Sequence, residues 1–341
     1  MSELSDVKAE EQTAEEQVAG LVEDAKAQQA AVVAAPEPKP PRRLNLIGRR
    51  NWFFALSLII IIPGIVSMAT KHFALGIDFA GGTELTVSFP GHPTLAEVQQ
   101  AVDHEGTNGS VISTGGDGYI IRYPALNTTQ LANVQSDLKS RLGQTNVQQI
   151  LTVGGTIAGE TIFLSLLAVV LASVAILLLL AIRFRNVPGG WRAGFQFGGS
   201  ALAALLHDVF VLTGIFSILG AFFGLRIGQI DAFFVTAVLT VVGFSVHDTI
   251  VVFDRIRENL RVSQRLSFEQ VVNLSIMQTA ARSIITSFTV VLVLAAILIA
   301  GGSTLQGLAL ALLIGIVSGT YSSIFNAAPL LVVWRKLQPL R

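Results

Sequence analysis

Long apolar stretches recur along the chain after its first 50 residues. Six of them are close to the roughly 20 apolar residues that an α-helix needs to cross the hydrocarbon core of a bilayer. They are Trp52–Ala69, Ile162–Ile182, Gly198–Ala221, Ala232–Phe253, Ile284–Ala300 and Leu305–Trp334. The fifth is short, and we expect it to begin earlier, near Ala280. The pattern predicts a polytopic α-helical membrane protein with six transmembrane helices.

Residues 71–157, between the first two spans, have a different pattern. Alternating apolar and polar positions predict strands at 84–89, 111–114, 119–123 and 147–153. Thr94, with Glu97 three residues later, and Asn127 are typical of helix N-termini. The resulting order of strand, helix, two strands, helix and strand predicts a small ferredoxin-like α+β domain between transmembrane helices 1 and 2. Because this fold serves many roles, we interpret it as a rigid docking module rather than a catalytic domain.

The composition agrees with a membrane protein. Only 13% of the 341 residues are charged, against about 25% in an ordinary soluble domain. The absence of cysteine excludes disulfides, a thiol enzyme and cysteine-ligated metal centres. The formal net charge of zero argues against nucleic acid as a partner, because phosphate binding requires an excess of basic residues.

The distribution of positive charge predicts the orientation in the membrane. With the N-terminus inside, 18 of the 23 Lys and Arg residues lie on the cytoplasmic side, so both termini are expected in the cytoplasm. The predicted parts are a cytoplasmic tail (1–44), transmembrane helix 1 (45–70), the extracytoplasmic domain (71–157), a bundle of helices 2–6 (158–334) with a cytoplasmic loop at 254–282, and a cytoplasmic C-terminus (335–341). Within that loop, Ser267 and Gln270 form a capping box that begins an interfacial helix leading to Arg282.

The first 44 residues lack the basic start and apolar centre of a signal peptide. They begin with many acidic residues and continue through an Ala/Gln stretch to four prolines between 36 and 41. Such a composition buries too little apolar surface to fold, so a disordered tail is predicted. The first span is then an anchor that is not cleaved.

The last span has a small residue at every fourth position. These residues are Gly307, Ala311, Gly315, Gly319, Ser323 and Ala327. Small side chains allow two helix backbones to approach closely in a membrane, so this stripe predicts tight packing against another helix. The pattern leaves open whether that helix belongs to this chain.

Two His-Asp pairs lie within predicted spans: His207-Asp208 in the third and His247-Asp248 in the fourth. An Asp at the bilayer centre costs at least about 2.5 kcal/mol on insertion scales, so such residues point to a function. Asp248 and Arg282 are expected at similar depths near the cytoplasmic side. Burial would favour the protonated carboxyl group and the arginine would favour the ionised one, which suits a proton relay.

Other interpretations of these charges remain open. Asp248 and Arg282 could form a fixed ion pair that only aligns two helices. A metal site formed by both His-Asp pairs is disfavoured, because adjacent side chains diverge by about 100° on a helix. An intramembrane aspartyl protease is disfavoured too: the chain lacks the Gly-x-Gly-Asp and Tyr-Asp sequences that we associate with that chemistry.

Five ordered motifs resemble the SecF proteins of the SecD/SecF protein-export family, in the resistance–nodulation–division superfamily. The resemblance covers most of residues 45–334. The motifs are Gly76-Ile77-Asp78-Phe79-Ala80-Gly81-Gly82, Ala203–Asp208, Val242–Asn259 with Asp254, Arg255, Arg257, Glu258 and Asn259 at its end, Arg282–Ser287, and Gly315–Ser323.

This resemblance implies a multi-pass subunit in the bacterial cytoplasmic (inner) membrane. It would act with SecD beside the SecYEG channel, with YajC, on a translocating preprotein, among membrane lipids and without nucleic acid. It would use the proton gradient, with protons as the only coupling ion and no other cofactor, to promote late steps of translocation, and it would not be an enzyme. The family pattern places the relay carboxylate on Asp248 and its basic partner on Arg282.

Some questions stay open beside the resemblance. His247 stands where the family commonly has Asn, and it would either join the relay or hydrogen-bond across helices; Asp208 and His207 are possible supports of the relay. The alternative functions are a proton-coupled exporter of small molecules or lipids and an intramembrane aspartyl hydrolase. Exporters of this superfamily usually have much larger outside domains.

Overall fold

The computed structural model of the protein describes residues 44–339, apart from 105–108, 188 and 263–264. The predicted disordered tail, up to residue 43, lies outside these residues. Six of the described helical segments are long and apolar enough to cross a membrane, which confirms the six predicted spans. They are Ile47–Lys71, Gly155–Arg183, Gly190–Phe222, Ala232–Val262, Phe268–Ala300 and Leu305–Leu337.

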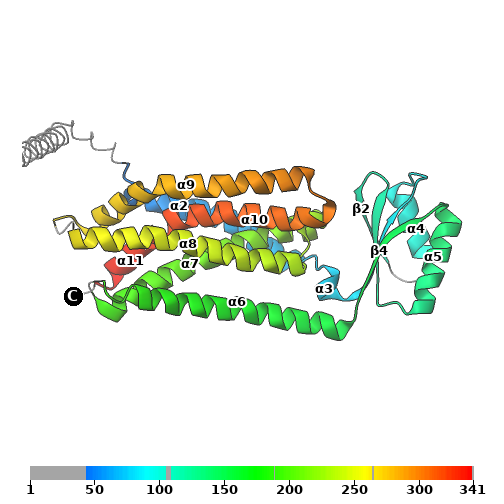
Figure 1. Cartoon of the computed structure of the whole chain (residues 1–341), viewed down its shortest axis with the longest axis horizontal. Helices are drawn as coiled ribbons and strands as arrows, with labels where there is room; N and C mark the ends of the chain where they lie inside the picture. The colour runs from blue at the N-terminus through cyan, green and yellow to red at the C-terminus, as the bar shows by residue number, and fades with distance from the viewer. Residues whose placement is uncertain (1–43, 105–108, 188, 263–264, 340–341) are drawn as a thin grey trace, which may run out of the picture. The chain divides into compact units, whose positions relative to one another are not determined.

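Within the bundle, α10 contacts α7, α8 and α9, and α7 also contacts α2 and α6. Figure 1 shows α7, α8, α9 and α10 running alongside one another. Their bounds are α2 (Arg50–Lys71), α6 (Gly155–Arg183), α7 (Gly190–Ser217), α8 (Ala232–Val262), α9 (Phe268–Ala300), α10 (Ser303–Ser322) and α11 (Ala328–Leu337). Short helical turns are η1 (Ile47–Arg49), η2 (Ile218–Phe222), η3 (Arg226–Gly228) and η4 (Ser323–Ala327). The last span is therefore α10 and α11 joined through η4, which is a single π-helical turn.

Between α8 and α9 the structure differs from the sequence prediction. Residues 254–262 continue α8, although the hydropathy pattern places them in a cytoplasmic loop. Residues 268–282 begin α9 as one uninterrupted helix, capped by the predicted box of Ser267 and Gln270, instead of forming a separate interfacial helix. Hydropathy detects where an apolar window ends, whereas charged residues such as Arg and Glu are good helix formers and continue the helix beyond it.

A four-stranded antiparallel sheet lies between α2 and α6 in the sequence. Its strands are β1 (Gly82–Ser88), β2 (Ser110–Gly115), β3 (Gly118–Tyr123) and β4 (Asn146–Val153), in the spatial order β2-β3-β1-β4. The domain also contains α3 (Ile77–Ala80), α4 (Leu95–His104) and α5 (Thr128–Leu142). Alternate residues of β1, including Leu85 and Val87, are fully buried with side chains of α4 and α5, and Figure 1 shows these helices on one face of the sheet. The predicted sequence of strands and helices is confirmed.

The stripe of small residues on α10 packs against α8 of the same chain, which answers the question that the sequence left open. A Cβ atom built on Gly315 would overlap the side chain of Val241. A Cβ atom on Gly319 would lie 3.0 Å from the Cβ of Ser245. The absence of these side chains brings α8 and α10 close enough for short hydroxyl side chains to reach from one helix to the other.

A second close crossing joins α2 to α7. A Cβ atom built on Gly64 would lie 2.7 Å from the Cα of Gly214. This atom belongs to the backbone of α7, so a side chain at residue 64 would force the two helices apart. Three residues further along both helices, the hydroxyl groups of Ser67 and Ser217 form a 2.9 Å hydrogen bond. Glycine contact and serine pairing together hold the first span in the bundle.

We expect Gly315→Ala to destabilise the bundle by about 1–3 kcal/mol, because the new methyl group overlaps Val241 in a packed core. The matched control is Gly159→Ala on α6, where a Cβ atom meets nothing within 4 Å. Thermal unfolding in detergent should show a lower midpoint for the first variant only. Equal midpoints for both variants would contradict the close packing of α8 and α10.

Candidate functional site

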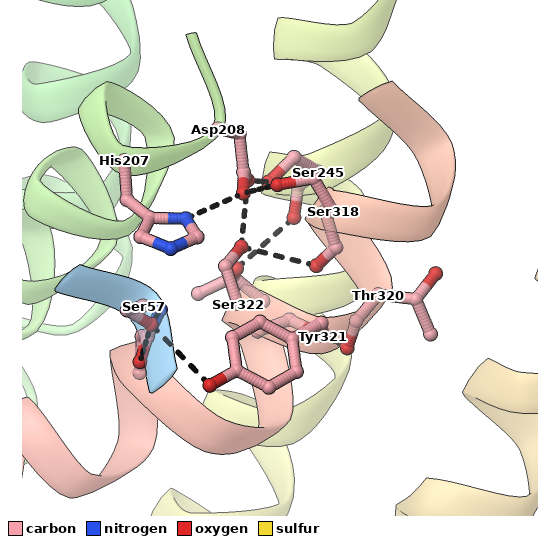
Figure 2. A network of polar contacts seen from close by, with 12 residues as sticks. Ser57, His207, Asp208, Ser245, Ser318, Thr320, Tyr321 and Ser322 are labelled. Atoms are coloured by element: carbon pink, nitrogen blue, oxygen red, sulfur yellow. Dashed lines mark hydrogen bonds and ion pairs between the residues drawn. The ribbon is translucent and has the colours of Figure 1, made fainter. Parts of the chain in front are cut away.

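Asp208 of α7 is 1% exposed, accepts hydrogen bonds from three serine hydroxyl groups and lies beside a histidine ring (Figure 2). Oδ2 accepts from the hydroxyl groups of Ser245 at 2.7 Å and Ser322 at 2.6 Å. Oδ1 accepts from the hydroxyl of Ser318 at 2.7 Å and lies 3.1 Å from Nδ1 of His207. A carboxylate offers about four lone-pair positions, so these four side chains can occupy all of them.

The helices explain why these donors converge. Ser318 and Ser322 are four residues apart and therefore lie on one face of α10. Ser245 approaches from α8, where the missing side chain of Gly319 leaves room for it. The carboxylate of Asp208 thus joins α7, α8 and α10 at a single point.

Asp248 of α8 is 7% exposed and has fewer partners. Its Oδ1 accepts from the hydroxyl of Ser283 on α9 at 2.5 Å, and its Oδ2 accepts from the hydroxyl of Ser323 at 3.0 Å. Two of its four lone-pair positions are therefore used by the described residues. The two aspartates differ in this respect, although both are buried in the bundle.

The junction of α10 and η4 connects the two carboxylates. Ser322 is the last residue of α10 and Ser323 the first of the π turn, and they donate to Asp208 and Asp248 respectively. Adjacent side chains on a helix diverge by about 100°, so neighbouring serines are well placed to serve two separate acceptors. Single π turns inside longer helices occur frequently at functional sites.

Each serine of this junction has a second acceptor within reach. The hydroxyl of Ser322 lies 3.2 Å from the carbonyl oxygen of Gly319, and that of Ser323 lies 3.1 Å from the carbonyl oxygen of Thr320. A hydroxyl group donates only one proton. Each serine can therefore exchange its carboxylate for a backbone carbonyl without losing a hydrogen bond.

Arg282 does not form the predicted ion pair with Asp248 in this structure. Its side chain is exposed, and the neighbouring Ser283 faces Asp248 in its place. The described residues show no ion pair of Arg282. Neighbours on a helix point in different directions, and here Ser283 points toward the carboxylate whereas Arg282 points away from it.

The two histidines lie in different environments. His247 is exposed, and no hydrogen bond or ion pair joins it to Asp208 or Asp248 among the described residues. His207 is nearly buried between Asp208 and Tyr321, and its Nε2 has no hydrogen-bond partner among the described residues. When Nδ1 donates to Asp208, the neutral ring leaves Nε2 as a free acceptor. No group of three or more metal-ligating side chains occurs in the described part of the chain.

Two family models match this chain. The C-terminal region of protein export membrane protein SecD/SecF matches residues 133–337, more than half of the chain, and the SecD/SecF GG motif matches residues 66–89. The chain belongs to the SecD/SecF family.

Individual members of the SecD/SecF family are similar along most of the chain. The protein translocase subunit SecF of Thermobaculum terrenum is 44% identical over 87% of this chain and 96% of its own length. That of Anaerolinea thermophila is 43% identical, over 85% of this chain and 94% of its own. The protein translocase subunit SecDF of Bacillus subtilis is 31% identical, and there the match covers 88% of this chain but 39% of the relative.

Crystal structures of SecDF have the same fold. The structure from Thermus thermophilus, described as a translocon-associated membrane protein, superposes with a TM-score of 0.77 at 29% identity. The match covers 91% of this chain and 41% of the SecDF chain, so this chain spans about two fifths of SecDF. A SecDF structure in a super-membrane-facing form gives a TM-score of 0.61 at 28% identity.

The charged residues of the SecD/SecF motif at the end of α8 connect this helix to its neighbours. Asp254 pairs with Arg183 of α6 at 2.9 Å and with Arg257 at 3.2 Å. Other contacts reach α9: Arg255 donates to Gln278 at 2.6 Å, and Asn259 donates to Ser275 at 2.8 Å and to Gln278 at 2.9 Å. Within α8, Arg255 also pairs with Glu258 at 2.6 Å. This motif holds the end of α8 that lies beyond Asp248.

The serine donors are the residues that sequence reasoning missed. Ser318, Ser322 and Ser323 lie in the family motif Gly315–Ser323, yet the sequence pattern predicts a role only for Ser323, in helix packing. The available signal was the coincidence of hydroxyl residues with helical spacing from an Asp, such as Ser245 three residues before Asp248. Which serine faces which carboxylate depends on helix packing and cannot be derived from spacing alone.

We expect Asp208→Asn to destabilise the protein by about 1–3 kcal/mol. The amide NH₂ would face hydroxyl donors and leave at least one buried polar group without an acceptor. The control is Asp137→Asn, on the surface of α5 with Arg141, where little change is expected. Unfolding by denaturant in detergent micelles measures both, and unchanged stability of the Asp208 variant would contradict the saturated network.

Proposed function

We propose that the chain is the SecF-type subunit of a protein translocase and uses the proton gradient through Asp248. The observation that carries this proposal is the difference between two buried carboxylates in one bundle. In the described structure Asp208 has four side-chain partners, whereas Asp248 has two. A proton can bind to a lone pair of Asp248 that accepts from no described residue, without displacing Ser283 or Ser323.

Proton binding at Asp248 would change the hydrogen bonds at the α10–η4 junction. A protonated carboxyl group becomes a donor on one oxygen and accepts less strongly. Ser323 then has its alternative acceptor, the carbonyl oxygen of Thr320, at 3.1 Å. A proton on Asp248 is thereby converted into a shift of hydrogen bonding in the last span, next to Ser322 and the fixed Asp208.

Arg282 is proposed as the basic partner of this relay, as the family resemblance implies. Its side chain lies on an exposed face of α9 that also carries Ile285 and Phe288. Because Arg282 and Asp248 are not paired here, their interaction belongs to another conformation of the cycle. His247 is also exposed, so we propose that any part it takes in the relay likewise belongs to another conformation of the cycle.

The proposed setting is a complex with SecD in the bacterial inner membrane. The SecDF relatives are longer chains of which this chain matches about two fifths, which supports a SecD partner for the remainder. SecYEG, YajC and the preprotein are further proposed partners. The strand order β2-β3-β1-β4 supports a ferredoxin-like domain, proposed to lie outside the cytoplasm with both chain termini inside.

Neither alternative function has an observation in its favour. An aspartyl hydrolase needs two carboxyl groups that share a proton. Here Asp208 and Asp248 have separate donors, and no hydrogen bond joins them in the described structure. The single α+β domain likewise offers nothing that favours export of small molecules or lipids.

The test is Asp248→Asn, expressed together with the partner subunit. We expect the variant to insert normally, because an amide can still accept from Ser283 or Ser323, and to lose the stimulation of preprotein export by the proton gradient. Translocation into membrane vesicles, measured with and without an ionophore, gives the readout. Asp103→Asn, exposed on α4, is the control. Full gradient-dependent export by the Asp248 variant would refute the relay.

A further inference from the structure

The segment of the GG motif before β1 is paired with the segment that leads into α8. The backbone N–H of Gly76 donates to the carbonyl oxygen of Ile230 at 2.7 Å, and the N–H of Ile230 donates to that of Ala74 at 2.8 Å. These bonds form an isolated parallel β-bridge between Leu75 and Ile230. Gly76 fits because a Cβ atom there would lie 2.7 Å from the Cβ of Asp231.

Two carboxylates meet at the N-terminus of α8. Asp231 caps its own helix, accepting from the backbone N–H of Phe234 at 2.8 Å. Asp78 of the GG motif accepts from the backbone N–H of Ala232 at 3.0 Å. The first four N–H groups of a helix lack partners within it, and a negative charge is favourable at that end. The motif thus supplies a second capping carboxylate for α8, in addition to that of Asp231.

An arginine of the sheet strengthens the same junction. Arg122 of β3 pairs with Glu84 of β1 at 2.7 Å. Its other nitrogen atoms reach the Oε1 of Gln229 at 2.7 Å and the carbonyl oxygen of Leu75 at 3.3 Å. One side chain therefore holds the sheet, the GG segment and the segment preceding α8.

The electrostatics agree with this close approach. Burial raises the pKa of Asp231, and the negative charge of Asp78 raises it further, while hydrogen bonds from backbone N–H groups act in the opposite direction. Asp78, Asp231 and Arg226 of η3 line a pocket of about 250 Å³ at this junction. Burial lowers the pKa of the Arg226 guanidinium group. Several charged side chains therefore lie close together where the GG segment pairs with the segment preceding α8.

We propose that Asp78 and Arg122 are positioning residues that join the α+β domain rigidly to α8, so that movement of the helix and of the domain is shared. This inference rests on the proposed role of Asp248. Asp248 lies sixteen residues after Ala232 on the same uninterrupted helix, roughly 24 Å away at 1.5 Å per residue. A rigid connection between α8 and the domain would transmit a change at the carboxylate to the domain.

The first experiment separates capping from charge. Asp78→Ala removes the acceptor for Ala232, whereas Asp78→Asn retains an oxygen that can cap the helix. We expect gradient-driven export to fall severalfold in the alanine variant, because Ala232 loses its acceptor in the domain, and to return to near the original level in the asparagine variant. Asp103→Ala, exposed on α4, is the control.

If Asp78 only stabilised the fold, its loss would reduce proton exchange and export together. A positioning role predicts instead that export falls while proton exchange at Asp248 continues. Infrared difference spectra of the complex with SecD should show normal proton exchange at Asp248 in the Asp78→Ala variant, although export is reduced. Unchanged export in this variant would overturn the inference, as would joint loss of export and proton exchange. If Asp248→Asn itself exports normally, the proposed function fails instead, so the two failures are distinguishable.

The second experiment tests directly whether the junction is rigid. The chain has no native cysteine, so in this chain only the introduced thiols would react with the cross-linker. Leu75→Cys and Ile230→Cys place two thiols across the β-bridge. After linking them with a short bis-maleimide, we expect export to remain within about twofold of the unlinked pair, because a rigid connection never opens. Loss of export on linking would show that this junction separates during the cycle and would overturn the inference.

Discussion

The structure depends on hydroxyl groups that satisfy carboxylates inside an apolar bundle. An unpaired charge in such an environment is costly, and no basic side chain balances Asp208 or Asp248 in the described structure apart from His207. Five serines from α8, α9, α10 and η4 supply the hydrogen bonds instead. Serine is short, so every one of these bonds requires backbones that approach closely.

Close approach explains why glycine and serine occur together in this protein. Gly315 and Gly319 allow α10 to lie against α8, and Ser318 and Ser322 then reach Asp208 on α7. The π turn after Ser322 directs Ser323 toward Asp248. The same close packing of helices therefore also provides the hydrogen bonds, with four side-chain partners at Asp208 and two at Asp248 among the described residues.

The fold could be predicted largely from the sequence because its signals are local. Apolar runs located the six spans, and the capping residues Asn127 and Ser267 located helix starts that the structure confirms. Arg282 shows where prediction stopped, since depth along a helix can be counted but the direction of a side chain cannot. The serine donors and the contact of Asp78 with α8 join residues from distant segments, so they became visible only in three dimensions.

The most direct test is an infrared titration of Asp248 in the complex with SecD, with Asp248→Asn to assign the carboxyl band. A band that appears and disappears with pH, and is absent from the variant, is the predicted result. A carboxyl group that stays in one protonation state throughout the accessible pH range would contradict proton-driven export by this subunit.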